Sequence, residues 1–568
     1  MQSTRSLLAV VATAAALTAQ NYTTTIIHIN TPGHPTNVVP GVGVPFRIAT
    51  GASTIFRRPT ISSDGQHLAF VAETNQATTA NEVLLLDGAL VMQEGQPTPW
   101  DGAYNLGGTW DDEFGLNDAG SILWAGDTSL ATTTDEQVAL FQGGVWTLIA
   151  QEGTNLNFGS FIPPTLTGLD PLLTGWGTGM DAPRITNGGQ LLWHVSAMKS
   201  LTTGTANDNL CVLGNGTVLQ EGVDVPAGQA GGGTLAFELF DAQDLYASPD
   251  GSVVLVSGNL TGTTNDNVLV VNGVVVVQEG IVLPGSSFAT GVNLIEKGWV
   301  DQAGNWYARG SVLTSADDWL VRNGVLLAKS DATTEIVPGS GEHYDDATYA
   351  ACFFAFDGNH LGQYVIGGVT DNADALRNGV IVFYDGLGQS QVVVRESDPI
   401  DLDGNGVFDN DRFFNTFGND DVLLLNDGSV IFTATVKNGA GTVVEHGLFR
   451  RYPHDASCVA RNGSNINPVG CGCVTLPITN TTWNLTVTNG PNTLASLLLA
   501  DVSPLPPVPV FGGELLIGPA PIAIGTAIPV PPSAAGLQFY LQGLRVDFDG
   551  VNWQFVLTNA VDATIGSY

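Results

Sequence analysis

The residues from Asp401 to Asp411 have the types and the spacing of a calcium-binding loop. Oxygen-bearing side chains occupy the first, third, fifth and ninth positions of this stretch, and a glycine occupies the sixth. In such loops alternate side chains point toward the ion, the glycine permits a sharp turn, and the seventh residue offers its carbonyl oxygen. Arg412 stands where such loops carry a bidentate glutamate, so we expect weak binding, at about 0.1 to 1 mM, with a solvated acidic turn as the alternative. The expected calcium ligands are Asp401, Asp403, Asn405, Val407 and Asp409.

A second group of acidic residues recurs in the short sequence motif Gln-Glu-Gly, which we call the acidic phrase. Four exact copies and one of two degenerate copies contain Glu94, Glu152, Glu221, Glu279 and Glu396. Such carboxylates could bind cations or sugar hydroxyls, or they could accept turn amide hydrogens at strand ends and hold adjacent repeats in register. Because catalysis needs one asymmetric cluster rather than several copies, we favour the structural role.

Two polar clusters interrupt the repeated pattern, one from Trp110 to Glu113 and one from Glu342 to Asp346. Either cluster could supply a general acid and base, or carboxylates for a cation, at one mouth of the fold. His343 is the most interesting single residue because its charge can change near neutral pH. Solvated loop carboxylates are the simpler interpretation in so acidic a chain.

The remaining motifs offer no complete catalytic set. Turns such as the one at Ser62 to Gly65 resemble the S-x-D-x-G-x-x-W turns of sialidases, but their glycine comes one residue too early. The scattered residues Arg184, Arg309 and Arg377 could form a carboxylate-binding triad. The sequence contains no Gly-x-Ser-x-Gly elbow, phosphate-cradling loop or His-Glu-x-x-His helix. We therefore expect no catalytic residues.

The elements that must position these residues follow from an internal repeat. Each copy has a turn glycine, then a hairpin with an Asp-Gly or Asn-Gly turn, whose two central residues need positive φ, and then the acidic phrase. In the fourth copy, strands are predicted at 244–247, 253–258, 267–271 and 274–278. Four antiparallel strands leave two apolar faces, which seven copies can bury by stacking side by side. The turn glycines are Gly65, Gly120, Gly189, Gly251, Gly304, Gly358 and Gly428.

Seven such copies predict an all-β fold, a seven-bladed β-propeller of four-stranded meander blades over residues 20–453, because a closed ring removes free edges. The seventh copy lacks its fourth strand. Residues 26–29 have the sequence of such a strand, and we expect them to pair with 443–450 and close the ring. Beyond the ring charge nearly vanishes and proline becomes dense, which predicts a separate small C-terminal β-sandwich over residues 454–568.

The N-terminus and the cysteines indicate an oxidising compartment. Arg5 precedes an apolar run at 7–17 followed by small residues, the pattern of a secretory signal peptide over residues 1–19; a short buried helix is the alternative. No later segment has the ~18 uninterrupted apolar residues of a membrane span. Cys458 is expected to form a disulfide with Cys471 or Cys473, while Cys211 and Cys352 are expected to be buried thiols.

Composition excludes two classes of partner. The 568-residue chain has 54 acidic and 18 basic residues and a formal net charge of −36, so it lacks the clustered cations that bind nucleic acid, and anionic membranes would repel it. Only 13% of the residues are charged, while 43% are hydrophobic. This composition is typical of a turn-rich β protein with an ample core.

Two stretches carry a resemblance to a known family. Residues 116–124 read Leu-Asn-Asp-Ala-Gly-Ser-Ile-Leu-Trp, and residues 394–399 read Val-Arg-Glu-Ser-Asp-Pro. They resemble the L-N-D-x-G-x-V-A-F and R-E-G-D-x-x-P-G repeats of an uncharacterised family of secreted bacterial repeat proteins, although four copies here carry Gln where that family favours Arg. Residues 536–542 and 557–560 are similar to a small C-terminal β-domain common on exported proteins. The resemblance implies export and a propeller-like ring, and no particular activity.

We therefore expect a secreted or cell-surface, non-enzymatic β-propeller that binds an extracellular ligand, either a glycan or a cell-surface protein. Neither nucleic acid nor a membrane span is expected. The alternative is a carbohydrate-active hydrolase or lyase that uses the cluster from Glu342 to Asp346. Five tryptophans could form sugar-stacking platforms, although core packing explains most of them better: Trp100, Trp110, Trp124, Trp193 and Trp306.

Overall fold

The protein is described by a computed structural model, in which strands predominate. It describes residues 22–48, 55–107, 110, 114–154, 173–200, 207–214, 218–262, 266–312, 317–345, 351–386, 388, 390–404, 408–453, 457–475, 477, 482–518, 522–530 and 537–566. The predicted signal peptide at 1–19 lies outside these residues. Within them the only helical element is a short 3-10 turn at Ala230–Gly232, and no helix is long and apolar enough to cross a membrane. The chain divides into two compact units, one of residues 26–450 and one that contains residues 451–568.

The larger unit contains seven four-stranded antiparallel sheets in its described part. The first sheet contains β2 (Phe56–Ile61), β3 (Leu68–Glu73), β4 (Glu82–Leu86) and β5 (Ala89–Gln93), and the second contains β6 (Phe114–Leu116), β7 (Ile122–Asp127), β8 (Glu136–Gln142) and β9 (Val145–Gln151). The third contains β10 (Leu173–Ile185), β11 (Leu191–Ser200), β12 (Leu210–Val212) and β13 (Val218–Gln220), and the fourth contains β14 (Phe237–Ala247), β15 (Val254–Leu260), β16 (Asn267–Val271) and β17 (Val274–Gln278). The four strands predicted for the fourth copy are thus confirmed, although β14 begins earlier than expected.

The last three sheets continue this order. The fifth contains β18 (Val292–Val300), β19 (Trp306–Val312), β20 (Asp318–Arg322) and β21 (Val325–Lys329), and the sixth contains β24 (Phe353–Gly358), β25 (Tyr364–Val369), β26 (Gly379–Tyr384) and β27 (Ser390–Arg395). Between them β22 (Asp331–Glu335) and β23 (His343–Asp345) form a two-stranded sheet. The seventh contains β28 (Phe413–Leu424), β29 (Val430–Lys437), β30 (Val443–Pro453) and β1 (Tyr22–Ile29).

The N-terminal strand completes the seventh sheet, as the sequence predicted. β1 lies beside β30, and the amide of Asn30 continues the pairing by donating to the carbonyl oxygen of His446 at 3.1 Å. The side-chain oxygen of Asn30 accepts a second hydrogen bond from the amide of His446 at 2.7 Å. Residues separated by more than 400 positions are therefore held together by backbone hydrogen bonds.

Turn chemistry explains why these segments form hairpins. Asp87 and Gly88, like Asn272 and Gly273, have positive φ angles, which is the type I′ geometry that two-residue hairpins favour. After each first strand a glycine with positive φ donates its amide to the carbonyl oxygen three residues earlier. In the sixth sheet this glycine is Gly362; the expectation of Gly358 was wrong, because that residue ends β24. The other six turn glycines are the predicted ones.

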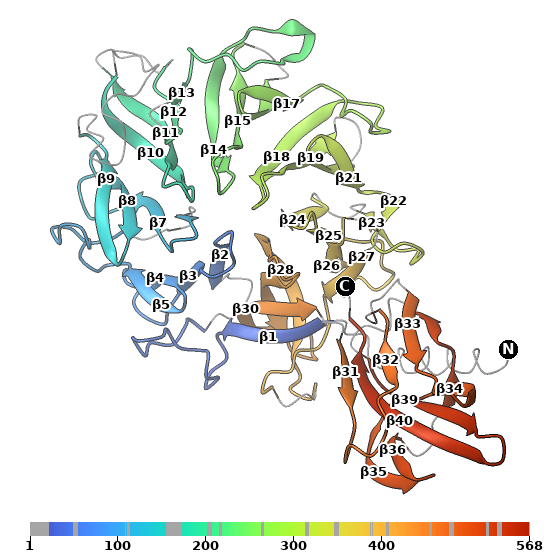
Figure 1. The fold of residues 1–568 in the computed structure, drawn as a ribbon. Coiled ribbons are helices and arrows are strands. Elements are labelled where there is room, and N and C mark those ends of the chain that lie inside the picture. Colours follow the sequence, from blue (N-terminus) through green and yellow to red (C-terminus); the bar gives the residue numbers. More distant parts are fainter. Residues whose placement is uncertain are drawn as a thin grey trace. The chain divides into compact units, whose positions relative to one another are not determined.

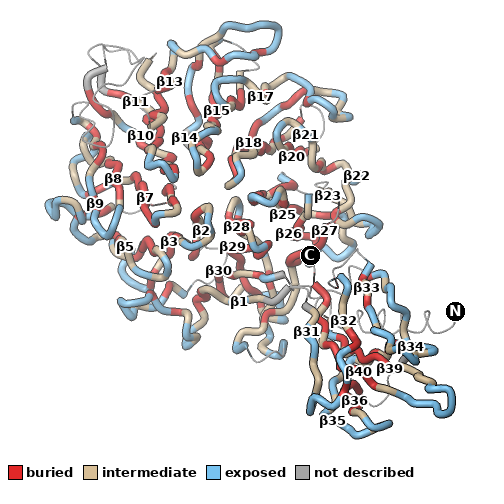
Figure 2. The backbone as a smooth tube through the Cα atoms, in the orientation of Figure 1, coloured by how far each residue is buried: buried red, intermediate tan, exposed pale blue. Residues whose placement is uncertain are grey.

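Successive sheets pack face to face and share apolar clusters. Leu123 and Val138 of the second sheet, for example, pack with Trp176 and Trp193 of the third. Figure 1 shows the sheets of residues 26–450 following one another around a common centre, with the first strands innermost. The contacts between sheets include those of β28 with β2, which join the seventh sheet to the first. Figure 2 shows buried stretches in the strands around this common centre.

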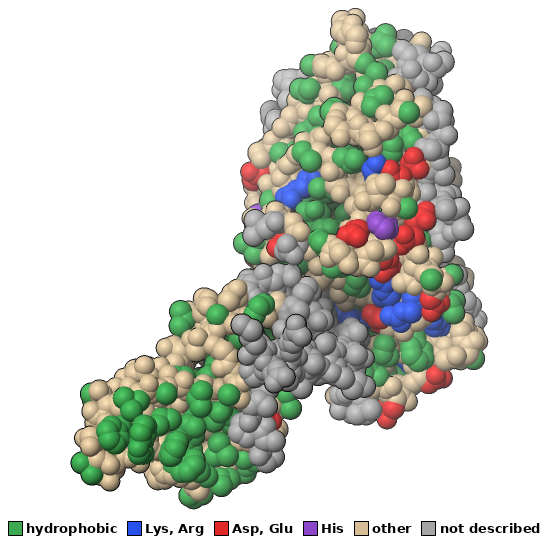
Figure 3. Space-filling model, turned by 90° about the vertical axis from the view of Figure 1, so that its right-hand side faces the viewer, with side chains coloured by type: hydrophobic (Ala, Val, Ile, Leu, Met, Phe, Trp, Pro, Cys, Tyr) green, Lys and Arg blue, Asp and Glu red, His purple; other side chains and the backbone are tan. Residues whose placement is uncertain are grey.

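The smaller unit is also built from antiparallel sheets. A five-stranded sheet contains β31 (Ser457–Arg461), β40 (Trp553–Thr564), β39 (Gln538–Phe548), β34 (Thr493–Asp501) and β37 (Ile522–Ile524), and a three-stranded sheet contains β32 (Cys471–Cys473), β33 (Thr482–Val487) and β38 (Ala527–Pro529). Both sheets contribute to one apolar cluster, and β35 (Pro504–Val510) pairs with β36 (Gly513–Ile517). Figure 3 shows apolar side chains gathered on the visible surface of this unit.

The cysteines behave as expected. Cys458 forms a disulfide with Cys473, one of the two predicted pairings. Cys211, Cys352 and Cys471 are buried free thiols.

Candidate functional site

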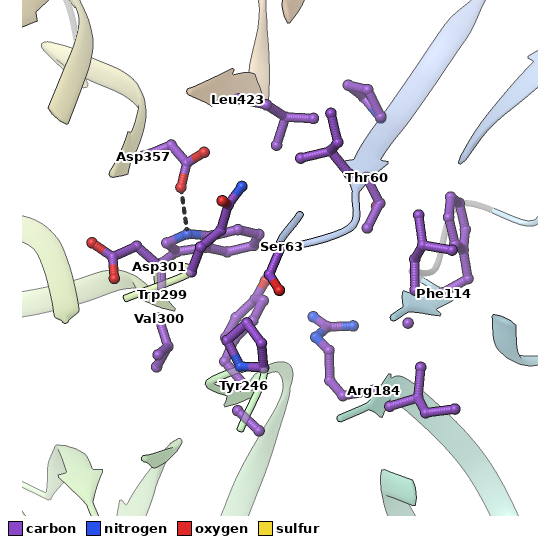
Figure 4. A pocket seen from close by; sticks show the side chains of 18 of the residues that line it. Thr60, Ser63, Phe114, Arg184, Tyr246, Trp299, Val300, Asp301, Asp357 and Leu423 are labelled. Carbon is purple, nitrogen blue, oxygen red and sulfur yellow. Dashed lines mark hydrogen bonds between the residues drawn. The ribbon is translucent and has the colours of Figure 1, made fainter. Parts of the chain in front are cut away.

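A cavity of about 130 Å³ lies where the seven first strands converge. The strands β2, β6, β10, β14, β18, β24 and β28 each contribute at least one residue to its lining. Figure 4 shows side chains from several of these strands pointing into the common space. The cavity therefore depends on all seven sheets at once.

Irregular backbone in the first strands places charged residues at this cavity. Arg58, Ala182 and Asp420 have φ angles of 51°, 48° and 58°, and the pairing registers of β2, β10 and β28 shift at these points. An extra residue at a β-bulge bends the strand and redirects nearby side chains. Arg58, Asp420 and Arg184 all line the cavity. Backbone strain of this kind gathers at functional sites.

Two of the carboxylates that line the cavity are held by neighbouring side chains or turns. Asp420 Oδ1 accepts a hydrogen bond from Arg309 Nη1 at 2.9 Å. Asp301 caps the turn after β18 by accepting two amide hydrogen bonds from it, and it accepts a third from the hydroxyl of Tyr307 at 3.0 Å. These contacts fix both side chains in place.

Asp357 is a buried carboxyl of the cavity, like Asp301. It accepts hydrogen bonds from Trp299 Nε1 at 3.2 Å and from the amide of Leu424 at 2.8 Å. Burial raises the pKa of Asp357 to about 7. This group therefore changes its charge near neutral pH while it links the sixth sheet to the seventh.

One wall of the cavity combines a cation with aromatic rings. The guanidinium carbon of Arg184 lies 4.2 Å from the centre of the Tyr246 ring, and the rings of Tyr246 and Trp299 lie 4.6 Å apart in a tilted arrangement. Figure 4 shows Arg184, Tyr246 and Trp299 lining the same space. A stacked guanidinium is held flat, and its N–H groups suit a carboxylate or another planar acceptor.

Polar residues from the turns after the first strands form a hydrogen-bonded rim along part of the cavity. Ser63 Oγ donates to Asp118 at 2.8 Å, and Asn187 Nδ2 donates to the same carboxylate at 2.6 Å. Asn426 Nδ2 donates to the carbonyl oxygen of Ser63 at 3.1 Å, and the amide of Asn187 donates to the carbonyl oxygen of Pro249 at 2.6 Å. These bonds join turns of five sheets, so the rim holds the first strands in place around the cavity.

The predicted calcium loop is described only in part. Asp401, Asp403 and Asp409 are described, whereas Asn405 and Val407 lie outside the described residues. The carbonyl oxygen of Leu402 accepts a hydrogen bond from His34 Nε2 at 3.0 Å. The calcium assignment of this loop stays a prediction.

The acidic phrases have a structural role, but one that differs in detail from the prediction. Glu94 accepts hydrogen bonds from the amides of Asn81 and Glu82 at the start of β4. Glu221, Glu279 and Glu396 each accept a hydrogen bond from one amide at or next to the start of β12, β16 and β26. These bonds join the last two strands of one sheet, and they do not hold adjacent sheets in register as we expected.

The cluster from Glu342 to Asp346 is tied into the protein. Glu342 forms two hydrogen bonds with Arg395 at 2.7 and 2.8 Å. His343 Nδ1 lies 3.0 Å from an Asp371 oxygen, and Tyr344 is buried. Asp346 lies outside the described residues. None of the described members of this cluster lines the cavity.

The other predicted positions are distributed over several places. Trp110 is buried, and residues 111–113 lie outside the described residues. Trp124 and Trp193 are buried core residues, whereas Trp100 and Trp306 are half-buried. Of the three scattered arginines, Arg184 lines the cavity and Arg309 binds Asp420 there, but Arg377 pairs with Asp398 outside its lining.

Sequence reasoning missed the cavity residues Arg58, Tyr246, Trp299, Asp357 and Asp420. Each lies in a first strand, a few residues before a turn glycine, which the sequence reveals in every case except that of Asp357. Their position before these glycines is the sequence signal by which the cavity residues could have been found. The bulges that turn these side chains toward the centre leave no recognisable pattern in the sequence.

No family model matches the chain, and no curated protein matches it. Similar solved structures include a calcium-binding protein, regucalcin, from Agrobacterium tumefaciens, which is 13% identical with a TM-score of 0.23; the match covers 58% of this chain and 88% of that one. An engineered GH43 glycoside hydrolase is 11% identical with a TM-score of 0.20, over 92% of this chain and 97% of that one. The arabinanase Arb43A of Bacillus subtilis is 12% identical with a TM-score of 0.18, over 58% and 89%. At these TM-scores the likenesses support no conclusion about function.

Proposed function

We propose that this chain is an exported seven-bladed β-propeller that binds a sugar unit bearing a carboxylate in its central cavity and does not transform it. Each four-stranded sheet is one blade in this proposal, and β1 closes the ring. Residues 454–568 form a β-sandwich that is not part of the ring. The observation that carries the proposal is the wall made by Arg184, Tyr246 and Trp299.

The chemistry of this wall fits an acidic sugar. Aromatic rings offer an apolar surface to the C–H face of a sugar ring, and a stacked guanidinium offers paired donors to a carboxylate. Arg58 adds a second positive charge to the lining. The ligand would meet these groups despite the negative charge of the whole chain, because Coulomb interactions are strongest at short range in a partly buried site.

The engaged carboxylates favour binding over hydrolysis. A hydrolase needs one carboxyl group that is free to donate a proton and another that acts on water or on the sugar. Asp301 and Asp420 are instead held by turn amides and by Arg309, and Asp357 by Leu424 and Trp299. The alternative that used Glu342 is less favoured because Arg395 binds both of its oxygens.

Calcium at the loop of Asp401, Asp403, Asn405, Val407 and Asp409 is part of the proposal, as is export through the leader at 1–19. Calcium is expected to stabilise this surface loop rather than to take part in ligand binding. Calorimetric titration of the intact chain with calcium, compared with its Asp403→Ala variant, tests the loop. Equal heats from the two proteins would contradict it.

Ligand binding is tested by calorimetry with short oligosaccharides that end in a uronic acid and with their neutral counterparts. The intact chain is expected to bind the acidic sugars, and Arg184→Ala to weaken binding about tenfold or more, the loss of one charge-assisted contact. Arg377→Ala is the matched control, because Arg377 pairs with Asp398 outside the cavity lining. Equal binding by the two variants, or no binding of any acidic sugar, would contradict the proposal.

The same sugars separate binding from hydrolysis. Release of new reducing ends is followed with the intact chain and with Arg184→Ala. Saturable binding without release supports the proposal. Release that depends on Arg184 would replace it with a hydrolase.

A further inference from the structure

Four side chains from four consecutive sheets form a line of contacts along the wall of the central cavity. The line begins at Arg184 in β10, whose guanidinium carbon lies 4.2 Å from the centre of the Tyr246 ring in β14. The Tyr246 ring lies 4.6 Å from that of Trp299 in β18, and Trp299 Nε1 donates to Asp357 Oδ1 at 3.2 Å. Figure 4 shows this last bond beside the open space of the cavity. The aromatic wall that we propose for ligand binding therefore ends at Asp357 in β24.

Asp357 fixes the orientation of the Trp299 ring. The indole Nε1 is the single polar atom of a tryptophan side chain, and it can only donate. Asp357 is 2% exposed, and its second oxygen accepts a hydrogen bond from the amide of Leu424 at 2.8 Å, so the acceptor is itself held in place. Trp299 is half-buried and lines the cavity. A change at Asp357 should therefore reach the ligand through the Trp299 ring.

The surroundings of Asp357 provide no cation for its carboxyl group. Asp301 Oδ2 accepts a hydrogen bond from the Tyr307 hydroxyl and lies 4.0 Å from a nitrogen of Arg322. Among the described residues no basic side chain forms an ion pair with Asp357 itself. The charged and titratable side chains around it on the neighbouring elements are Asp301 after β18, Tyr307 and Arg309 in β19, Arg322 in β20 and Asp420 in β28.

The charge of Asp357 changes over the range in which many extracellular ligands are bound. Burial, together with repulsion from Asp301, raises the pKa of Asp357 to about 7. About nine tenths of the molecules then carry a neutral Asp357 at pH 6, and about one tenth at pH 8. A sugar carboxylate and the arginines keep their charges throughout this range. No histidine lines the cavity in the described part of the chain.

We propose that Asp357 positions Trp299 in the ligand-binding wall and couples ligand binding to a proton, so that the cavity takes up an acidic sugar with Asp357 neutral and releases it when Asp357 ionises. This inference rests on the proposed function and adds the regulation of the same site. A carboxylate at Asp357 would repel the carboxylate of the ligand within a partly buried cavity. A neutral carboxyl group removes this repulsion and still has acceptor capacity for Trp299.

The affinity for an acidic sugar should therefore fall as the pH rises. Because only the fraction with neutral Asp357 is competent to bind, the Kd should increase about tenfold from pH 6 to pH 8. Calorimetric titration of the intact chain with an oligosaccharide that ends in a uronic acid measures this change. At pH 8 binding should also take up close to one proton, which is measured by repeating the titration in buffers of different ionisation enthalpy.

Two variants separate Asp357 from the other groups that titrate near neutral pH. Burial also raises the pKa values of Glu152 and Glu221 to about 7, but neither residue lines the cavity. Asp357→Asn cannot ionise, so it should bind the sugar equally well at pH 6 and pH 8. Asp374→Asn, at an exposed position, is the matched control and should keep the tenfold change of the intact chain.

Trp299→Phe tests the positioning role. Phenylalanine keeps an aromatic ring beside Tyr246 but cannot donate to Asp357. Since the indole donor favours the ionised form of Asp357, its loss should raise the pKa of Asp357 and move the midpoint of the binding curve to higher pH. Without any ligand, the difference in fluorescence between the intact chain and Trp299→Phe reports on the Trp299 indole. This difference should change with a midpoint near pH 7, and it should not change with pH when both proteins also carry Asp357→Asn.

The outcomes distinguish this inference from the proposed function. Equal affinity of the intact chain at pH 6 and pH 8, or an unchanged pH dependence in Asp357→Asn, would overturn the inference and leave the proposed function standing. A fluorescence difference that does not titrate would overturn the positioning of Trp299 by Asp357. Failure of every acidic sugar to bind at any pH would overturn the proposed function, and the coupling to a proton with it.

Discussion

Asp244, Asp357 and Asp421 each accept a backbone hydrogen bond from the first strand of a neighbouring sheet, at 2.8 to 3.0 Å. Each first strand is an edge strand of its sheet, so the amides on its outer side have no ladder partner. A short carboxylate side chain from the next sheet satisfies such an amide where backbone pairing cannot. These carboxylates lose their hydration on folding, which disfavours their charged form. Their pKa values should therefore control how the stability of the protein depends on pH.

Asp421→Asn is expected to stabilise the protein at neutral pH. Burial raises the pKa of Asp421 to about 6, while an unfolded chain has an aspartate pKa of about 3.9. A raised folded-state pKa contributes stability at low pH that is lost as the pH rises through about 4 to 6, so the ionised group lowers stability by up to about 3 kcal/mol above that range. Asparagine keeps an acceptor for the Arg58 amide and can donate to Thr433 Oγ1, the two present partners.

The measurement is urea unfolding at about pH 4 and about pH 8 for both proteins, since this range spans the titration of Asp421. The difference in unfolding free energy between variant and intact chain should grow from the lower to the higher pH. The exposed residue Asp374 provides a control as Asp374→Asn. A pH-independent difference for Asp421→Asn would refute the argument.

His446 should lower the stability of the protein at acid pH, whereas Asp421 lowers it at neutral pH. Its Nδ1 accepts hydrogen bonds from the amides of Ile55 and Phe56 at 3.1 and 3.2 Å, and burial lowers its pKa to about 4. A lowered histidine pKa gives stability above the unfolded value of about 6.5 that is lost as the pH falls toward 4. His446→Asn keeps an acceptor at the same distance along the side chain and cannot become charged. We expect the variant to lose less stability than the intact chain between about pH 6.5 and 4 in thermal unfolding; parallel curves would contradict this.

At the scale of strands and turns, the sequence predicted what local chemistry dictates. Glycine with Asp or Asn marked the hairpins, and the missing fourth strand of the last repeat correctly pointed to residues 26–29. The sequence did not predict the bulges at Arg58, Ala182 and Asp420, because these depend on how a first strand fits between two neighbouring sheets. The cavity residues were missed for the same reason. Their assembly joins seven segments whose separation in sequence carries no signal of their meeting.

The N-terminal strand should contribute as much to the stability of the seventh sheet as an interior strand does. Ile29 is fully buried beside the pairing of β1 with β30, so Ile29→Ala is expected to cost about 2 to 5 kcal/mol. Thr25→Ala, at an exposed position of the same strand, should cost little. Urea unfolding measures both changes. Hydrogen exchange provides a second test, in which amides of β1 should be as protected as those of β30; rapid exchange of β1 would show that it is not a stable part of the seventh sheet.

At the scale of the whole molecule, the two units differ in how many charged residues they contain. Of the 54 acidic residues, 48 precede Arg451, as do 15 of the 18 basic ones. Salt should therefore screen the repulsion between acidic residues within 26–450. The smaller unit has only six acidic and three basic residues from Arg451 onward. It should therefore be nearly insensitive to salt. The smaller unit depends instead on its shared apolar cluster and on its disulfide.

Loss of the disulfide should destabilise only the smaller unit. Cys458 and Cys473 are 15 residues apart, and closing a loop of that length stabilises a fold by about 3 kcal/mol in the chain-entropy model. Cys458 lies in β31 and Cys473 in β32, strands of the two sheets that share the apolar cluster, so the bond also fixes these sheets to each other.

Calorimetry of the chain with both cysteines changed to serine should show one unfolding transition moved to lower temperature and a second transition unmoved. Ile29→Ala identifies the unmoved transition, because it should shift only the unfolding of residues 26–450. Cys471→Ala, which removes a buried thiol and leaves the disulfide, is the matched control. A single transition that moves as a whole would mean that the two units unfold together and that the disulfide stabilises both.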